Sequence, residues 1–102
     1  MDNGEILSAL NAHRAEIEQL GVVSLALFGS VARNEARPES DVDILVEVQR
    51  PMGAFRFVDL KQRLEEILQR RVDLVTARAL KPRLRSRVLQ EAVLAFGHDP
   101  AA

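Results

Sequence analysis

The fold is decided by two short stretches of the sequence, FGSVAR at residues 28–33 and SDVDILV at residues 40–46. The first stretch follows an apolar run that predicts a buried strand over 22–28, and its glycine begins a turn into a short helix over 30–36. The second stretch places two carboxylates at the start of an apolar strand over about 41–48. A small-residue turn that lies ahead of paired carboxylates indicates a site for a phosphorylated ligand and a divalent cation.

The carboxylates of Asp41 and Asp43 are spaced for a shared site. Residues two apart in a strand point to the same face, so these side chains are expected side by side, roughly 6–7 Å apart at the backbone. Alternation predicts a core-facing set and an outward set: Val42, Ile44, Val46 and Val48 against Asp41, Asp43, Leu45 and Glu47. Two close carboxylates repel unless a cation separates them, and Mg²⁺ in phosphate-transfer sites is typically held by one or two carboxylates. The alternative is a turn residue followed by a solvated strand residue.

Gly29 and Ser30 have the chemistry of a phosphate-binding turn. Glycine lets the backbone approach a ligand closely, and the first amides of the following helix, with the serine hydroxyl, offer hydrogen-bond donors. Arg33 lies one turn further on and has a forked donor geometry that suits a phosphate. Each feature also has an ordinary interpretation, because Gly-Ser occurs in common turns and a single arginine is often solvated.

Asp73 is the third candidate carboxylate. Residues 71–75 predict a short strand in which Val72 and Leu74 face the core and Asp73 points away. If this strand lies beside the strand at 41–48, three carboxylates converge, as two-metal phosphoryl transfer requires. Asp73 could then bind a second metal ion and accept the proton of the attacking hydroxyl. The alternative is a surface residue on an edge strand.

Helical periodicity accounts for the remaining elements. Helices are predicted over 3–20, ending at Gly21, over 54–69, and from Pro82 to about Ala95. Within the last helix, Arg87 and Glu91 are spaced for an ion pair. Helices that alternate with strands predict the α/β class, with a small mixed β-sheet flanked by helices.

Taken together, these motifs resemble the signature of polymerase-β-type nucleotidyltransferases, and most closely their minimal (MNT) antitoxin members. The similarity covers most of the chain, including the strand with Asp73 and the segment 80–93. It implies the polymerase-β-like fold, a nucleotide bound by Gly29 and Ser30, metal ions on Asp41 and Asp43, and a third catalytic carboxylate at Asp73. Arg33 and Ser40 are further candidates for binding the nucleotide, and Asp73 is a further candidate metal ligand. In one departure, Asn34 stands where the family usually has glycine, although asparagine also tolerates positive φ.

The resemblance also implies an activity and a partner. Minimal nucleotidyltransferases of this kind are often encoded beside HEPN-domain proteins that resemble ribonuclease toxins. The expected reaction transfers AMP from ATP, with two Mg²⁺ ions, to a hydroxyl of the toxin, in a possible homo- or hetero-oligomer. One alternative is an antitoxin that neutralises the toxin by binding alone. Another is a manganese-dependent enzyme that uses a sugar nucleotide, although such enzymes usually need a longer chain.

Composition narrows the class of protein. The 102 residues suit a single domain over 1–102. A net charge of −1 gives no indication of a broad nucleic-acid surface, so direct nucleic-acid binding is not expected. The absence of cysteine excludes disulfides and thiolate catalysis. No apolar run suits a signal peptide or a membrane span, so a cytoplasmic protein is expected.

Overall fold

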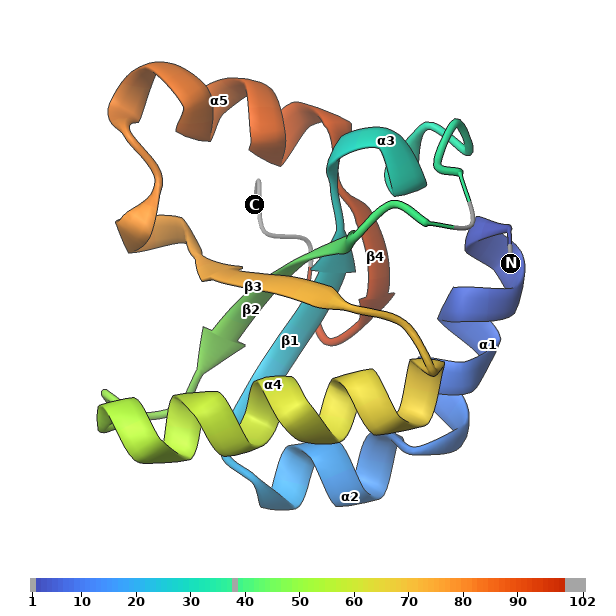
Figure 1. Cartoon of the computed structure of the whole chain (residues 1–102). Coiled ribbons are helices and arrows are strands. Elements are labelled where there is room, and N and C mark those ends of the chain that lie inside the picture. The colour runs from blue at the N-terminus through green and yellow to red at the C-terminus, as the bar shows by residue number, and fades with distance from the viewer. Residues whose placement is uncertain (1, 38, 99–102) are drawn as a thin grey trace.

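A four-stranded mixed sheet forms the centre of the fold. The computed structural model describes residues 2–37 and 39–98. The strands are β1 (Val22–Leu27), β2 (Val42–Val48), β3 (Val72–Thr76) and β4 (Val93–Phe96), in the order β3-β2-β1-β4. Strand β1 pairs antiparallel with β2 and with β4, whereas β2 and β3 are parallel (Figure 1). The predicted α/β class and small mixed sheet are confirmed.

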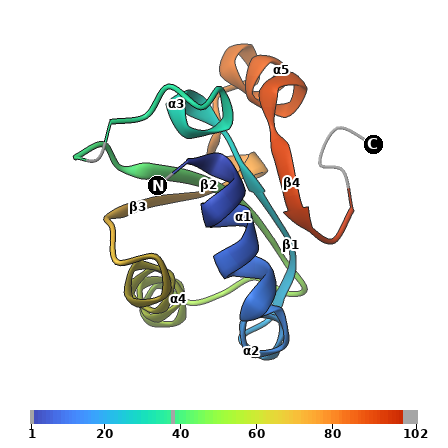
Figure 2. The same cartoon turned by 90° about the vertical axis from the view of Figure 1, so that its right-hand side faces the viewer.

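The helices fall into two groups around this sheet. The helices are α1 (Asn3–Ala12), α2 (Arg14–Gln19), α3 (Gly29–Ala32), α4 (Ala54–Leu68) and α5 (Pro82–Glu91), with a 3₁₀ turn η1 (Ala77–Ala79). Helices α1, α2 and α4 lie at one side of the sheet, whereas α3 and α5 are neighbours near one end of it (Figures 1 and 2). Within the described residues, every helix is too short or too polar to cross a membrane.

The core lies between the sheet and the layer formed by α1, α2 and α4. The helical half of this core consists of buried apolar residues of α1, α2 and α4: Ile6, Leu10, Ile17, Leu60, Leu64 and Leu68. The predicted inward face of β2 is confirmed, since Val42, Ile44 and Val46 are all buried. The opposite face is less polar than predicted, because Leu45 is buried beside its β1 partner Ala26.

The predicted helix over 3–20 is interrupted at His13. The backbone of His13 has φ −108° and ψ 17°, outside helical geometry, and it separates α1 from α2. Polar side chains at the break bond backbone carbonyls of α1 and of β4: Asn11 donates to Leu7 O (2.9 Å) and Ala95 O (2.8 Å), and His13 Nδ1 lies 3.0 Å from Ala9 O. Such side-chain bonds compete with regular helix geometry, which accounts for the difference.

The prediction that the last helix runs to Ala95 is wrong. Helix α5 ends at Glu91, Ala92 is extended (φ −63°, ψ 137°), and the chain then forms β4 against β1. None of the α5 residues is fully buried, so the helical spacing of its apolar residues did not mark a core face. The sequence feature that could have predicted strand β4 is the apolar run 92–96 followed by Gly97.

The short helix after Gly29 is also briefer than predicted. It ends at Ala32, where the sequence indicated a helix over 30–36. Asn34 follows in the left-handed region with φ 59°, as its tolerance of positive φ predicted. The chain therefore leaves the helix early, and the described residues between Asn34 and β2 belong to no helix or strand.

Gly97 tests the unexpected β4 pairing. A Cβ at Gly97 would lie 2.6 Å from Val23 O, and its φ of +99° disfavours side chains. We expect Gly97→Ala to lower the free energy of unfolding by about 1–3 kcal/mol, measured by urea denaturation. The control is Gly53→Ala, where an added Cβ meets no described atom within 4 Å; its expected change is within about 0.5 kcal/mol. Equal effects of the two substitutions would contradict the β4 packing.

Candidate active site

The parallel pairing of β2 and β3 places Asp43 directly opposite Asp73. The register matches Val42 with Val72, Asp43 with Asp73 and Ile44 with Leu74. Since Val42 and Ile44 are buried in the core, the carboxylates lie on the other face of the sheet. Asp43 is half-buried and Asp73 is exposed. The predicted adjacency of these two strands and their acidic residues is confirmed.

The Gly29–Ser30 bend lies against the same carboxylate. Phe28 N donates to Asp43 O at 3.0 Å, which extends the β1–β2 pairing to the bend. Gly29 has φ +67°, and a Cβ there would overlap Asp43 Oδ2. Glycine is therefore required twice, by its backbone angle and by the space that Asp43 occupies. The two motifs that stood out in the sequence thus meet at one point, where Gly29 and Ser30 are each half-exposed.

Asp41 is held less firmly than the other two acidic residues. It precedes the first residue of β2, and its side chain is 52% exposed. Its ion-pair partner is Arg71, whose Nε lies 3.9 Å from Asp41 Oδ1 with the side chain 84% exposed, so this pair contributes little. The neighbouring Ser40 hydroxyl accepts a hydrogen bond from Arg37 N at 3.2 Å and so takes part in a turn.

Three carboxylates in one place perturb the ionisation of Asp43. Burial, then the Asp73 carboxylate, then the charge of Asp41 raise the pKa of Asp43 to about 6, while Arg33 opposes the shift. Burial is the largest of these causes, and the opposing charge of Arg33 is the smallest. A bound cation would remove this penalty, because opposite charge favours the ionised carboxylate.

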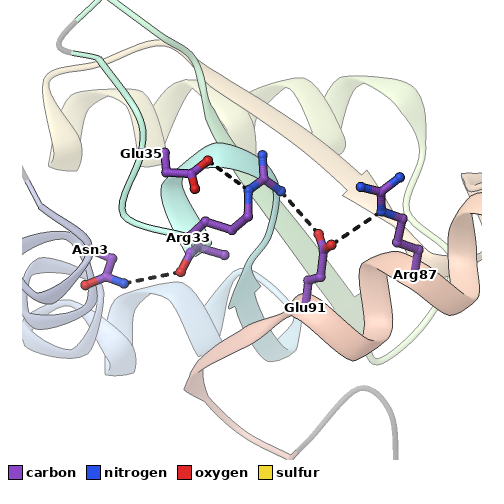
Figure 3. A network of polar contacts seen from close by, with 6 residues as sticks. Asn3, Arg33, Glu35, Arg87 and Glu91 are labelled. Carbon is purple, nitrogen blue, oxygen red and sulfur yellow. Dashed lines mark hydrogen bonds and ion pairs between the residues drawn. The ribbon is translucent and has the colours of Figure 1, made fainter.

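Arg33 is engaged by two glutamates. Its Nε donates to Glu35 at 3.1 Å and its Nη1 to Glu91 at 3.2 Å, and Glu91 also accepts from Arg87 (Figure 3). The Arg87–Glu91 pair was predicted from its spacing. The Arg33–Glu91 contact joins α3 to α5 over 58 residues and has no local signal in the sequence. The side chains involved are partly exposed, so a phosphate could compete for Arg33.

The donor set suits magnesium. Among residues 2–37 and 39–98, no three acidic or histidine side chains are already grouped to hold a metal ion. Asp43 and Asp73 nevertheless offer adjacent hard oxygen ligands, with Asp41 near enough to affect their charge. Mg²⁺ usually takes one or two carboxylates and completes its shell with water and substrate phosphates. The residues therefore fit a metal ion that arrives with a phosphorylated ligand.

Comparison with known proteins agrees with this geometry. The sequence profile described as "Nucleotidyltransferase domain" matches residues 10–95, which include all three carboxylates and the glycine bend. The chain belongs to this nucleotidyltransferase family. The expectation of an enzyme of the nucleotidyltransferase class is thereby confirmed.

Relatives and solved structures refine the similarity. Protein adenylyltransferase MntA of Thermococcus cleftensis is 43% identical over 90 residues, which cover 87% of this chain and 91% of the relative. A solved structure described as a minimal nucleotidyltransferase superposes with a TM-score of 0.79 at 41% identity, covering 91% of this chain and 95% of that one. A chain from a Shewanella oneidensis complex, between a tri-AMPylated HEPN toxin and an MNT antitoxin, shares the fold (TM-score 0.59, 23% identity, 86% and 72% coverage).

The raised pKa of Asp43 predicts a pH dependence of stability in this nucleotidyltransferase. Because the folded-state pKa exceeds that of the unfolded chain, protonated Asp43 favours the fold at low pH, and this contribution is lost as pH rises through about 6. Without metal ions, we expect Asp43→Asn to stabilise the protein by about 1 kcal/mol at pH 8, after discounting for solvent screening, and hardly at all at pH 4. Thermal unfolding in EDTA measures the difference.

The matched control for this measurement is Asp59→Asn, which changes an exposed carboxylate on α4. We expect it to alter stability by the same small amount at both pH values. A stabilisation by Asp43→Asn that does not depend on pH would contradict the raised pKa of Asp43, and with it the burial of this carboxylate beside Asp73.

Proposed function

We propose that this nucleotidyltransferase is a magnesium-dependent protein adenylyltransferase that transfers AMP from ATP to a hydroxyl of a partner protein. The observation that carries the proposal is the meeting of Asp43, Asp73 and the Gly29 bend at one end of the β2–β3 pair. The MntA relative, which is named a protein adenylyltransferase, supports AMP as the transferred group.

In this proposal the Gly29–Ser30 bend binds the triphosphate of ATP. The backbone amides that follow the Gly29 bend and the Ser30 hydroxyl donate to phosphate oxygens, while the missing side chain at Gly29 leaves room for the Asp43 carboxylate beside them. When ATP binds, Arg33 releases one of its glutamate partners and binds a phosphate oxygen instead, an interaction that suits its guanidinium group. Ser40 supports nucleotide binding indirectly, because its hydroxyl closes the turn that precedes Asp41 and strand β2.

The acidic residues direct the transfer itself. Asp41 and Asp43, together with Asp73, would hold two Mg²⁺ ions, which supply charge stabilisation for the attacking and leaving oxygens. The acceptor oxygen attacks the α-phosphorus of ATP, the bond from that phosphorus to the β-phosphate bridging oxygen breaks, and pyrophosphate leaves. Asp73 is exposed and takes the proton of the acceptor hydroxyl. The products are an AMP ester of the partner and pyrophosphate.

A HEPN-type toxin is the proposed acceptor. The S. oneidensis complex pairs an MNT antitoxin with a tri-AMPylated HEPN toxin, and its antitoxin family is the one that this sequence resembles. We propose that the chain acts in the cytoplasm as the antitoxin of such a toxin. The chain would recognise its acceptor within a complex of the two proteins.

The test is incubation of the protein with α-labelled ATP, Mg²⁺ and the HEPN-domain protein of the same gene neighbourhood. We expect Asp43→Asn and Asp73→Asn each to reduce AMP transfer by about 10³-fold, because each removes a ligand of the metal site, worth several kcal/mol at the transition state. Asp59→Asn on α4 is the control and should retain full activity. Transfer by the Asp43→Asn variant at the wild-type rate would contradict the proposal.

A second measurement separates catalysis from neutralisation by binding alone. A variant with Asp41, Asp43 and Asp73 all changed to asparagine should still fold and bind the HEPN protein but should fail to suppress its toxicity. Full suppression by that variant would favour the binding-only antitoxin.

A further inference from the structure

The three acidic residues of the site are fixed by different means. Asp43 and Asp73 belong to paired strands, so the β2–β3 register sets their separation. Asp41 lies outside β2, and its contact with the exposed Arg71 is long. Its position therefore depends on the preceding turn, which the contacts of Arg37 and Ser40 define. Whatever fixes this turn also fixes the third carboxylate.

Arg70, in the connection between α4 and β3, binds this turn. Its Nη2 donates to Arg37 O at 2.8 Å and to Ser40 O at 2.6 Å, so one nitrogen bridges both ends of the turn. The turn is closed internally as well, by Ser40 N donating to Arg37 O at 2.9 Å. The two Arg70 contacts span 33 and 30 residues of sequence, and the second ends one residue before Asp41.

The Arg70 guanidinium is also unusually placed for an arginine. Its Nε and Nη1 are buried and make no hydrogen bond with any described residue. Buried donors without partners cost stability. If only solubility mattered, a lysine or glutamine whose polar end reaches solvent would be expected at this position. The backbone of Arg70 is held between two elements. It follows Gln69, the left-handed residue at the end of α4, and lies two residues before β3.

We infer that Arg70 is a positioning residue that holds the 37–40 turn so that Asp41 reaches the metal ion beside Asp43. The inference rests on the proposed function, because it assigns Asp41 a metal-binding role. Arg70 acts on Asp41 indirectly, through its hydrogen bonds to the carbonyls of Arg37 and Ser40. Lysine, which also offers one nitrogen to the two carbonyls but lacks the rigid planar group that sets the direction of the N–H bonds, would replace it only in part.

A double-mutant cycle on metal binding tests the inference without using catalysis. The probe is Mn²⁺ with a non-hydrolysable ATP analogue, and its affinity is measured by electron paramagnetic resonance. We expect Arg70→Met to weaken Mn²⁺ binding about tenfold, the usual effect of losing a residue that orients a metal ligand. In an Asp41→Asn background the same change should have little further effect, because the carboxylate that Arg70 positions is already absent.

Two further variants make the outcome decisive. Arg70→Lys should restore part of the affinity, whereas Arg56→Met, at an exposed arginine of α4, should leave it unchanged. If Asp41→Asn weakens binding and Arg70→Met does not, or if their effects simply add, the positioning role is overturned while the proposed function stands. If Asp41→Asn itself leaves Mn²⁺ affinity unchanged, the metal-binding role of Asp41 fails and the role of Arg70 fails with it, while a metal ion on Asp43 and Asp73 still stands.

Discussion

The parallel register of β2 and β3 is the constraint on which the rest of the site depends. It places Asp43 opposite Asp73 at the end of two strands whose alternate side chains are buried in the core. A shift of one residue in β3 would turn Asp73 into the core and bring Val72 out. The same apolar alternation that stabilises the sheet therefore keeps both carboxylates on the accessible face.

The second constraint is the contact between Gly29 and Asp43. The bend can approach the carboxylate only because Gly29 lacks a side chain and adopts positive φ. This contact brings a turn suited to phosphate within reach of ligands suited to magnesium. Burial of Asp43 and the repulsion from Asp73 and Asp41 together raise its pKa, and this is the cost of a site arranged for a cation that is bound with its substrate.

The sequence was most informative where short-range pattern and chemistry coincide. Alternation placed Asp43 and Asp73 away from the core, and the glycine bend was evident from residue type alone. Strand β4 was missed because the apolar residues of α5 suggested a longer helix, although that helix buries none of them fully. The contacts of Arg70 with residues 37–40 and of Arg33 with Glu91 were missed because they join distant segments. Such contacts depend on tertiary structure and leave no periodic signal.

The most direct test is anomalous diffraction from crystals of the protein grown with Mn²⁺ and a non-hydrolysable ATP analogue. The account predicts an anomalous peak at ligand distance, about 2.1 Å, from carboxylate oxygens of Asp43 and Asp73, with the triphosphate against Gly29 and Ser30. A nucleotide bound elsewhere, or a structure in which Asp43 and Asp73 share no metal ion, would contradict it.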